Sequence, residues 1–201
     1  MIEIINISKK FENKLVIHNL NAKLEFGINC IMEPSGSGKT TLANIIAGIL
    51  KPDSGEIKGT GDVSMVFQED RLLENETALT NVLFVNSEKY RLYAKIKAKA
   101  LLEKLSLENE LNTKVKNLSG GMKRRVAICR ALLANYDTLI LDEPFKGLDE
   151  KIKKNTMDIV KEYSKDKIVI LITHNVNEAN YLNARILDNI FQNCTLTRCM
   201  S

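Results

Sequence analysis

The chain has 201 residues, of which 44% are hydrophobic and 27% charged, and its formal net charge is +4. This length supports one full hydrophobic core with a small additional unit, and the composition is that of a globular protein rather than a disordered one. No apolar run approaches the roughly 20 residues that cross a bilayer. The chain begins in a strand pattern rather than a secretory signal, so we expect a cytoplasmic protein. The small charge, with few interleaved aromatic residues, argues against a nucleic-acid partner.

The first segments read as strands. Apolar and polar residues alternate over residues 2–7 and 16–26, which predicts an antiparallel β subdomain with Phe11 in the loop between its strands. On the residues alone, Phe11 is interpreted as a core residue.

A glycine-rich loop follows an apolar run at residues 28–32 and precedes a helical pattern at residues 42–50. Strand, loop and helix in this order are the context that identifies a phosphate-binding loop. Its glycines let backbone N–H groups point at phosphates, and the helix N-terminus adds favourable partial charge. The predicted nucleotide-binding residues here are Ser35, Gly36, Ser37, Gly38, Lys39, Thr40 and Thr41, with Lys39 on the β- and γ-phosphates and Thr40 on Mg²⁺.

Glu33 departs from this pattern, which has glycine at its first position. A carboxylate about 6–8 Å from a triphosphate would repel it by roughly 2–3 kcal/mol per charge pair at an effective dielectric near 20. Alternatively, Glu33 points to solvent or pairs with a lysine and costs little. Both interpretations remain open at this stage.

Helical patterns then occupy residues 78–85, 90–107 and 122–133, which form an inserted helical subdomain over about residues 69–134. The last of these helices is preceded by Ser119, Gly120 and Gly121, so it offers a second helix N-terminus open to an anion. Since the first loop already holds the phosphates of its own chain, this second site requires a triphosphate from elsewhere.

Strand and helix alternate again beyond residue 138. The apolar run at 139–141 ends in Asp142 and Glu143, and the run at 167–172 ends in Thr173 and His174. Parallel strands present their carboxyl ends at one edge of a sheet, so Asp142, Glu143 and His174 should face one crevice. We expect Asp142 to hold Mg²⁺ and Glu143 to polarise an attacking water, with His174 bridging the γ-phosphate and that carboxylate.

Gln68 follows the apolar run at 63–67, and its amide is the remaining polar candidate for Mg²⁺ and the attacking water. The fold expected from these elements is α/β: a P-loop NTPase core with a mostly parallel sheet, an N-terminal antiparallel β subdomain and an inserted α-helical subdomain. We expect residues 1–201 to form a single domain.

Together these motifs resemble the nucleotide-binding domain of ATP-binding cassette (ABC) transporters, over nearly the whole chain from residue 4 to about residue 187. Residues 33–41 resemble the Walker A motif, 118–121 the family signature, 139–143 Walker B and 147–149 the D-loop, while Gln68 and His174 resemble the Q-loop and switch residues. Arg124 stands where the family usually has glutamine.

The resemblance implies ATP and Mg²⁺ as cofactors and a head-to-tail pair of ATPase domains, identical or paralogous. Each ATP would lie between one P-loop and the opposite signature, where Ser119, Gly120 and Gly121 contact it. The resemblance also assigns nucleotide contacts to Phe11, stacked on adenine, and to Asp149. Residues 71–82 and 142–145 are similar to importers for nitrate, sulfonate and taurine, which implies permease subunits as partners and a peripheral position on the inner face of the membrane.

Three functions are compatible with these motifs. The first is an active ATPase subunit of a transporter. The second is a degenerate nucleotide-binding regulatory module with weak or no hydrolysis because of Glu33. The third is a soluble cassette ATPase that acts on DNA or the ribosome, although such relatives carry long coiled coils or tandem cassettes that this sequence does not show.

Overall fold

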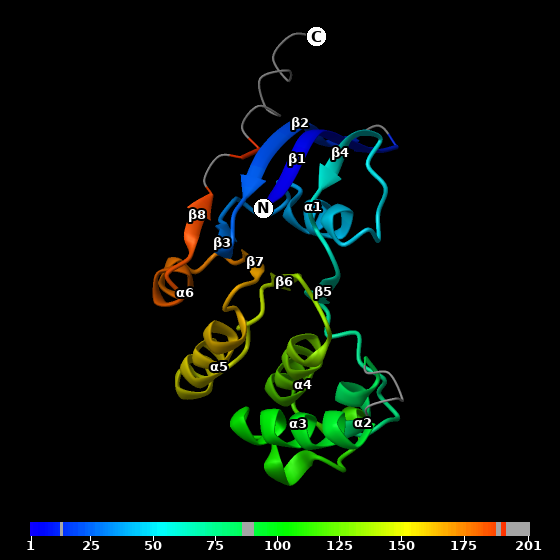
Figure 1. Ribbon diagram of the computed structural model, residues 1–201, viewed down its shortest axis with the longest axis vertical. Coiled ribbons are helices and arrows are strands. Elements are labelled where there is room, and N and C mark those ends of the chain that lie inside the picture. The colour runs from blue at the N-terminus through cyan, green and yellow to red at the C-terminus, as the bar shows by residue number, and fades with distance from the viewer. Residues whose placement is uncertain (13, 86–90, 188–189, 192–201) are drawn as a thin grey trace.

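The computed structural model describes residues 1–12, 14–85, 91–187 and 190–191 (Figure 1). Its strands are β1 (Ile2–Phe11), β2 (Lys14–Leu24), β3 (Gly27–Ile31), β4 (Ser54–Lys58), β5 (Val63–Val66), β6 (Thr138–Asp142), β7 (Ile168–Ile172) and β8 (Arg185–Leu187). Its α-helices are α1 (Lys39–Ile46), α2 (Ala78–Leu83), α3 (Arg91–Lys104), α4 (Gly120–Leu133), α5 (Glu150–Tyr163) and α6 (Val176–Tyr181), and two short 3₁₀ turns span Glu108–Glu110 and Val115–Asn117. Within the described ranges, no helix is long and apolar enough to cross a membrane.

The centre of the molecule is a parallel sheet with strand order β5-β6-β7-β3-β8. Every residue of β6 and β7 is buried, as is usual for parallel strands covered by helices on both faces. The two strands pair in register from Thr138 opposite Ile168 to Asp142 opposite Ile172. This arrangement confirms the expected α/β fold with a mostly parallel sheet.

Two hydrophobic cores lie on opposite faces of this sheet. Because side chains alternate along a strand, Leu139 and Leu141 of β6 pack into one core and Ile140 packs into the other. The first core includes the helices α2, α3, α4 and α5. The second includes α1 and the N-terminal strands. A shift in the strand register would move side chains out of both cores at once, so the observed register is the one that fills them.

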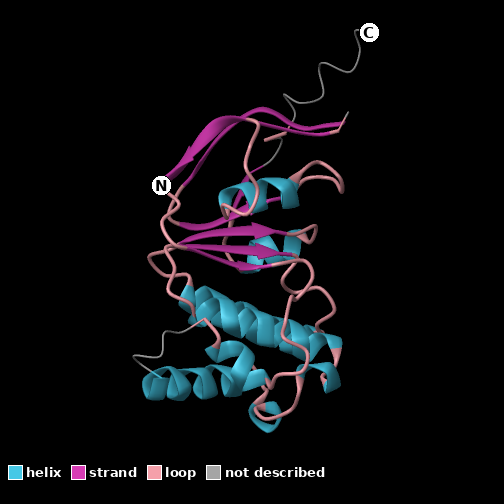
Figure 2. Ribbon diagram, turned by 90° about the vertical axis from the view of Figure 1, so that its right-hand side faces the viewer, coloured by secondary structure: helices cyan, strands magenta, loops and turns pink. Residues whose placement is uncertain are grey.

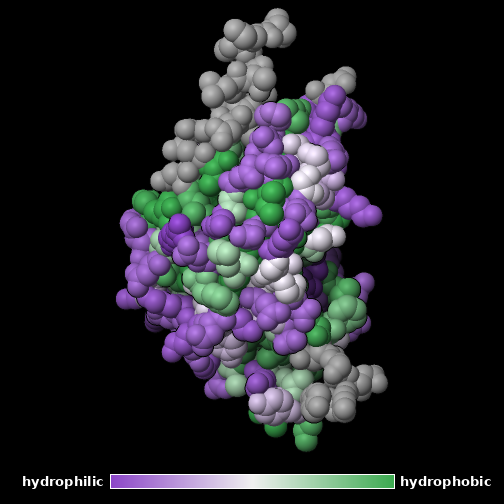
Figure 3. All heavy atoms as spheres, turned by 45° about the horizontal axis from the view of Figure 1, so that its top comes forward, coloured by the Kyte–Doolittle hydropathy of each residue, from purple (hydrophilic) through white to green (hydrophobic). Residues whose placement is uncertain are grey.

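The N-terminal strands form a separate antiparallel sheet with order β2-β1-β4. Figure 2 shows the resulting layers, with the antiparallel sheet above α1, the parallel sheet below α1, and the long helices beyond it. On the face drawn in Figure 3, hydrophilic residues cover most of the described surface and apolar residues occur in small groups.

Several element boundaries differ from the sequence-based prediction. Phe11 is the last residue of β1 rather than part of a loop, because β1 continues past residue 7 in its pairing with β2. The helix predicted over 42–50 spans Lys39–Ile46, and it ends there because Gly48 adopts the left-handed conformation, with φ of 70°. The predicted helices 78–85 and 90–107 are α2 and the shorter α3, and residues 86–90 lie outside the described residues.

We expect Gly55→Ala to destabilise the protein strongly, since Gly55 has a φ of 87° and a Cβ there would lie 2.4 Å from the carbonyl oxygens of Ile5 and Asn6. Gly48→Ala is the matched control, because Gly48 has a φ of 70° but no atom within 4 Å of the added Cβ. Urea denaturation should show a loss of about 1 kcal/mol for Gly48→Ala and at least about 2 kcal/mol more for Gly55→Ala. Equal losses would contradict the steric argument.

Candidate functional site

The carboxyl ends of β3, β6 and β7 meet at one edge of the parallel sheet, where a cavity of about 950 Å³ opens. This volume is at the upper end of the range for small-molecule sites. The lining includes Ser35, Gly36, Gly38, Lys39, Thr40, Thr41, Gln68, Asp142, Glu143 and His174. Ten residues that the sequence predicted for nucleotide, metal or catalysis thus share one cavity.

The loop after β3 has the backbone geometry of a phosphate-binding loop. Gly36 and Gly38 have φ values of 80° and 106°, which residues with a Cβ rarely adopt. Gly38 caps α1 at its N-terminus, so the free N–H groups of the first helical turn face the loop. Ser37 Oγ is buried and lacks a hydrogen-bond partner in the described part of the chain. A buried hydroxyl of this kind is expected where a loop binds a polar ligand.

Lys39 folds back onto the same loop. Its Nζ donates hydrogen bonds to the carbonyl oxygens of Glu33 at 2.6 Å and Pro34 at 2.8 Å. Burial lowers the pKa of Lys39, while the carboxylates of Glu143, Asp142 and Glu33 act in the opposite direction. The Lys39 ammonium is therefore surrounded by negatively charged groups, and a bound phosphate would be a further negative neighbour.

The backbone conformation at position 33 is compatible with glutamate. Its φ is not positive, so the conformational freedom of glycine is not required at this position. Its carboxylate does not line the cavity, and its Oε1 is buried without a hydrogen-bond partner among the described residues. The residue is half-buried, and at least one of its carboxylate oxygens is withdrawn from solvent.

Thr40 and Asp142 provide a pair of oxygens suited to Mg²⁺. The Thr40 hydroxyl donates to Asp142 Oδ2 at 2.8 Å, although the residues are 102 positions apart. Burial raises the pKa of Asp142, and the Thr40 hydrogen bond and the charge of Arg124 oppose this shift. Among the described residues, no group of three or more His, Cys, Asp or Glu side chains is arranged to hold a metal ion by itself. A Mg²⁺ ion would therefore need phosphate oxygens and water as its remaining ligands, which is its usual mode of binding.

Glu143 and His174 lie next to each other in the lining of the cavity. His174 Nε2 lies 3.4 Å from Glu143 Oε1, close enough for a charge interaction but not placed for a hydrogen bond. Glu143 also has a φ of 49°, unusual for a residue with a side chain. Burial raises its pKa, and His174 opposes that shift. In the described structure, its Oε1 is left without a hydrogen-bond partner, as suits a carboxylate that accepts a proton from water.

The sequence analysis missed several residues at this cavity. Lys14 and Val16 reach it from β2, and Lys153 and Glu178 line its inner side. Glu178 is buried, accepts a hydrogen bond from the Thr173 hydroxyl at 2.6 Å, and lies 4.0 Å from Lys153 Nζ. The only sequence signal for Glu178 was its position four residues after His174, on the helix that follows β7.

Six predicted residues do not line this cavity. They are Ser37, whose Oγ is buried in the loop, and Phe11, Ser119, Gly120, Gly121 and Asp149. Phe11 is 44% exposed at the strand end, and Asp149 caps α5 by accepting from the N–H of Ile152 at 3.0 Å. Ser119 and Gly120 are exposed at the start of α4, where Ser119 accepts from the N–H of Met122.

A parallel sheet with a glycine-rich loop, a lysine, a threonine–aspartate pair and a free carboxylate at one edge defines a P-loop nucleoside triphosphatase. Comparison with known proteins gives the family. Residues 17–146 match the ABC transporter family, and the chain belongs to it. Its members are ATP-binding ATPases.

Two relatives and two solved structures illustrate this membership. The aliphatic sulfonates import ATP-binding protein of Pseudomonas syringae pv. tomato is 36% identical over 89% of this chain and 78% of its own length. The ergothioneine transport ATP-binding protein of Helicobacter pylori is 33% identical over 94% of this chain and 96% of its own. The dimeric structure of a bacterial ABC transporter cassette aligns with a TM-score of 0.80 and 31% identity over 90% of this chain and 91% of that one. A post-hydrolysis dimer bound to ADP and Pi aligns with a TM-score of 0.79 and 30% identity, over the same shares of the two chains.

We expect Glu143→Gln to raise the free energy of unfolding of the nucleotide-free protein at pH 7 by about 1 kcal/mol, because it removes the charge of a half-buried carboxylate whose Oε1 accepts no hydrogen bond from the described residues. The folded-state pKa of Glu143 is raised, so ionisation destabilises the folded wild type above that pKa. The difference should therefore shrink as the pH falls through the raised pKa, since the wild-type carboxyl is then neutral as well. Urea denaturation at several pH values measures it, with the exposed Glu103→Gln as control.

We expect Glu33→Gly to change ATP affinity by less than about threefold, because the Glu33 carboxylate does not line the cavity. Isothermal calorimetry with Mg-ATP measures this, and Glu33→Gln separates the effect of the charge from that of the side-chain length. Tightening by a factor of about ten or more in both variants would show that this carboxylate repels the phosphates.

Proposed function

We propose that this chain is the ATP-hydrolysing subunit of a membrane transporter, most simply an importer, and that it works as a head-to-tail dimer that shares two ATP molecules. The observation that carries this proposal is the separation of two anion sites on one chain. One is the cavity around Lys39, and the other is the exposed N-terminus of α4 at Ser119 and Gly120.

The geometry of the second site requires another molecule. Ser119 and Gly120 do not line the cavity that holds Lys39, so a nucleotide in that cavity is not reached by them within one chain. A Cβ on Gly120 would have no atom within 4 Å, so the start of α4 is open to an approaching surface. A Cβ on Gly121 would lie 3.5 Å from atoms of Gly147 and Leu148, so the start of α4 and the segment 147–148 are neighbours, as a site built from both would need.

Within the cavity, each residue has a distinct task. Lys39 releases the carbonyls of Glu33 and Pro34 to bind phosphate oxygens, and the N–H groups of the loop orient them. Thr40, Asp142 and Gln68 are the side chains placed to hold Mg²⁺, which would offset charge on the phosphates. Glu143 accepts a proton from the attacking water, and His174 holds the γ-phosphate close to that carboxylate.

A permease partner is supported by the relatives and by the surface of the helical layer. The sulfonate relative named above is an import protein, and so are relatives named for sulfate/thiosulfate and for spermidine/putrescine. Exposed apolar side chains gather near α2 and α3: Phe84 is 72% exposed, Leu92 76% and Ile96 60%. Apolar surface of this kind is suited to docking another protein. The solutes in the relatives' names differ, so the proposal does not extend to the solute.

The alternative, a regulatory module disabled by Glu33, has weaker support. Glu33 is not among the residues that line the cavity, while Lys39, Glu143 and His174 line it. The third function, action on DNA or the ribosome, has no observation in its favour.

We expect Mg-ATP hydrolysis per molecule to rise with protein concentration, because the site is complete only in the dimer. Glu143→Gln should lower the rate by at least about a hundredfold, since general-base catalysis contributes factors of this order. A rate per molecule that is constant over the whole concentration range would contradict the shared site.

A mixing experiment tests the sharing directly. Lys39→Ala and Ser119→Arg should each abolish turnover alone, but their mixture should regain activity. A mixed dimer has one intact P-loop facing one intact signature, so random pairing restores roughly a quarter of the sites. No regain on mixing, with both variants folded by circular dichroism, would refute the head-to-tail arrangement.

A further inference from the structure

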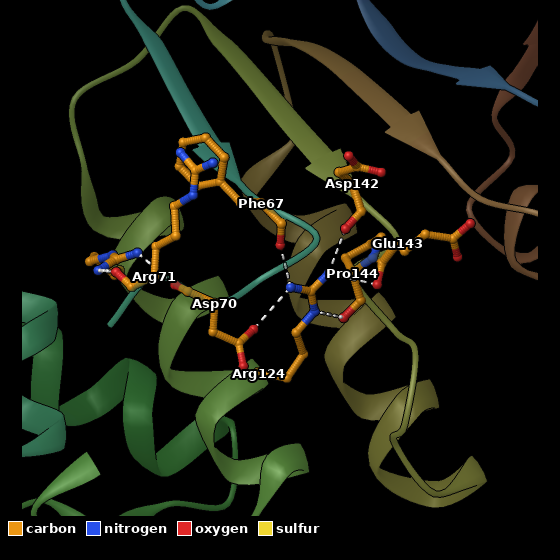
Figure 4. A network of polar contacts seen from close by, with 8 residues as sticks. Phe67, Asp70, Arg71, Arg124, Asp142, Glu143 and Pro144 are labelled. Carbon is orange, nitrogen blue, oxygen red and sulfur yellow. Dashed lines mark hydrogen bonds and ion pairs between the residues drawn. The ribbon is translucent and has the colours of Figure 1, made fainter. Parts of the chain in front are cut away.

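Arg124 is buried between the two loops that carry the cavity's polar residues. It belongs to α4, and its side chain is only 6% exposed. Figure 4 shows its guanidinium between the loop after β5, which contains Gln68, and the end of β6, which carries Asp142 and Glu143. A buried arginine is costly unless its donors are satisfied.

All five N–H donors of this guanidinium have acceptors. Nε donates to Pro144 O at 3.0 Å, Nη1 to Phe67 O at 2.5 Å and Asp70 Oδ1 at 2.9 Å, and Nη2 to Asp142 O at 2.5 Å and Glu143 O at 2.6 Å. Arginine has five such donors in a fixed planar fork, so none is left over. Two of the bonds are to the loop after β5 and three to the segment after β6.

The glutamine usual in the family could not make this set of contacts. A glutamine amide has two N–H donors, so it could satisfy at most two of the five acceptors. The remaining carbonyl oxygens would stay buried and unpaired, which weakens the link between the two loops. Arginine at this position therefore has a structural consequence that glutamine would not have.

We propose that Arg124 is a positioning residue that ties the Gln68 loop to the segment of Asp142 and Glu143, and so sets the distance between the amide and the two carboxylates. This inference rests on the proposed ATPase function of the cavity. Glu143 has an unusual φ of 49°, and three consecutive carbonyls around it are bound by Arg124. The guanidinium thus holds the backbone conformation that directs the Glu143 carboxylate into the cavity.

Arg130 provides a matched control on the same helix. Its Nη1 donates to Arg71 O at 2.9 Å and its Nη2 to Asp70 O at 3.0 Å, so among the described residues its side-chain hydrogen bonds reach only the loop after β5. Arg130 is half-buried, whereas Arg124 is buried, and both donate to backbone carbonyls. Only Arg124 joins the two sides.

Hydrogen–deuterium exchange of the nucleotide-free protein is the first test. Arg124→Gln should speed amide exchange at least about tenfold in residues 67–72 and also in residues 142–148. Arg130→Gln should speed it only in residues 67–72. Should Arg124→Gln fail to fold because Asp70 loses its partner, Arg124→Gln with Asp70→Asn removes both charges and is used in its place. Exchange that is unchanged in residues 142–148 would overturn the proposal.

Steady-state hydrolysis is the second test. Arg124→Gln should lower kcat at least about tenfold while KM for ATP stays within about threefold, because misplacing the reacting groups affects the transition state more than binding. Arg124→Lys, which keeps the charge but has three donors, should fall between, and Arg130→Gln should retain wild-type kcat within about threefold. A kcat for Arg124→Gln equal to that for Arg130→Gln would overturn the proposal. If the wild-type chain hydrolyses no ATP at all, the proposed function fails, and the exchange comparison still decides the role of Arg124.

Discussion

The register between β6 and β7 is the constraint on which the site depends. Both strands are fully buried, so a slip of one residue would move each apolar side chain into the wrong core on both faces of the sheet. Since Asp142 pairs with Ile172, the two strands end at the same level, and Glu143 and His174 follow within two residues of these ends. The side-by-side placement of the two strand ends is therefore a consequence of hydrophobic packing, whereas Arg124 acts on the backbone that follows β6.

Much of this site could be predicted from sequence because its signals are local. Glycines followed by lysine and threonine after a strand specify a loop, and strand ends in a parallel sheet specify a shared edge. This reasoning located Lys39, Asp142 and Glu143. The five bonds of Arg124 could not be predicted, because three of them involve carbonyls 18 to 20 positions away and two involve a loop 54 to 57 positions away. Phe11 was misplaced for a different reason, since strand pairing extended β1 beyond its apolar pattern.

Two features of Glu143 lower the stability of the folded protein. Glu143 combines an unusual backbone conformation with a buried oxygen that no described residue satisfies. Such features persist only where the surrounding structure holds them in place. Here the register of β6, the Arg124 contacts and the packing of the buried Phe145 hold Glu143 in its conformation. Natural proteins commonly trade stability for function in this way at active sites.

The hydrogen bonds of Lys39 have a consequence for ligand selectivity. Two of the three N–H donors of its ammonium are already bound to carbonyl oxygens of its own loop, so a small anion finds one donor available and any further contact with the lysine must replace an existing bond. A triphosphate engages the lysine, the loop amides and the helix N-terminus together, so it gains enough contacts to compensate for that exchange. The loop therefore favours a polyphosphate over a chloride or a single phosphate, because the smaller anions make fewer simultaneous contacts.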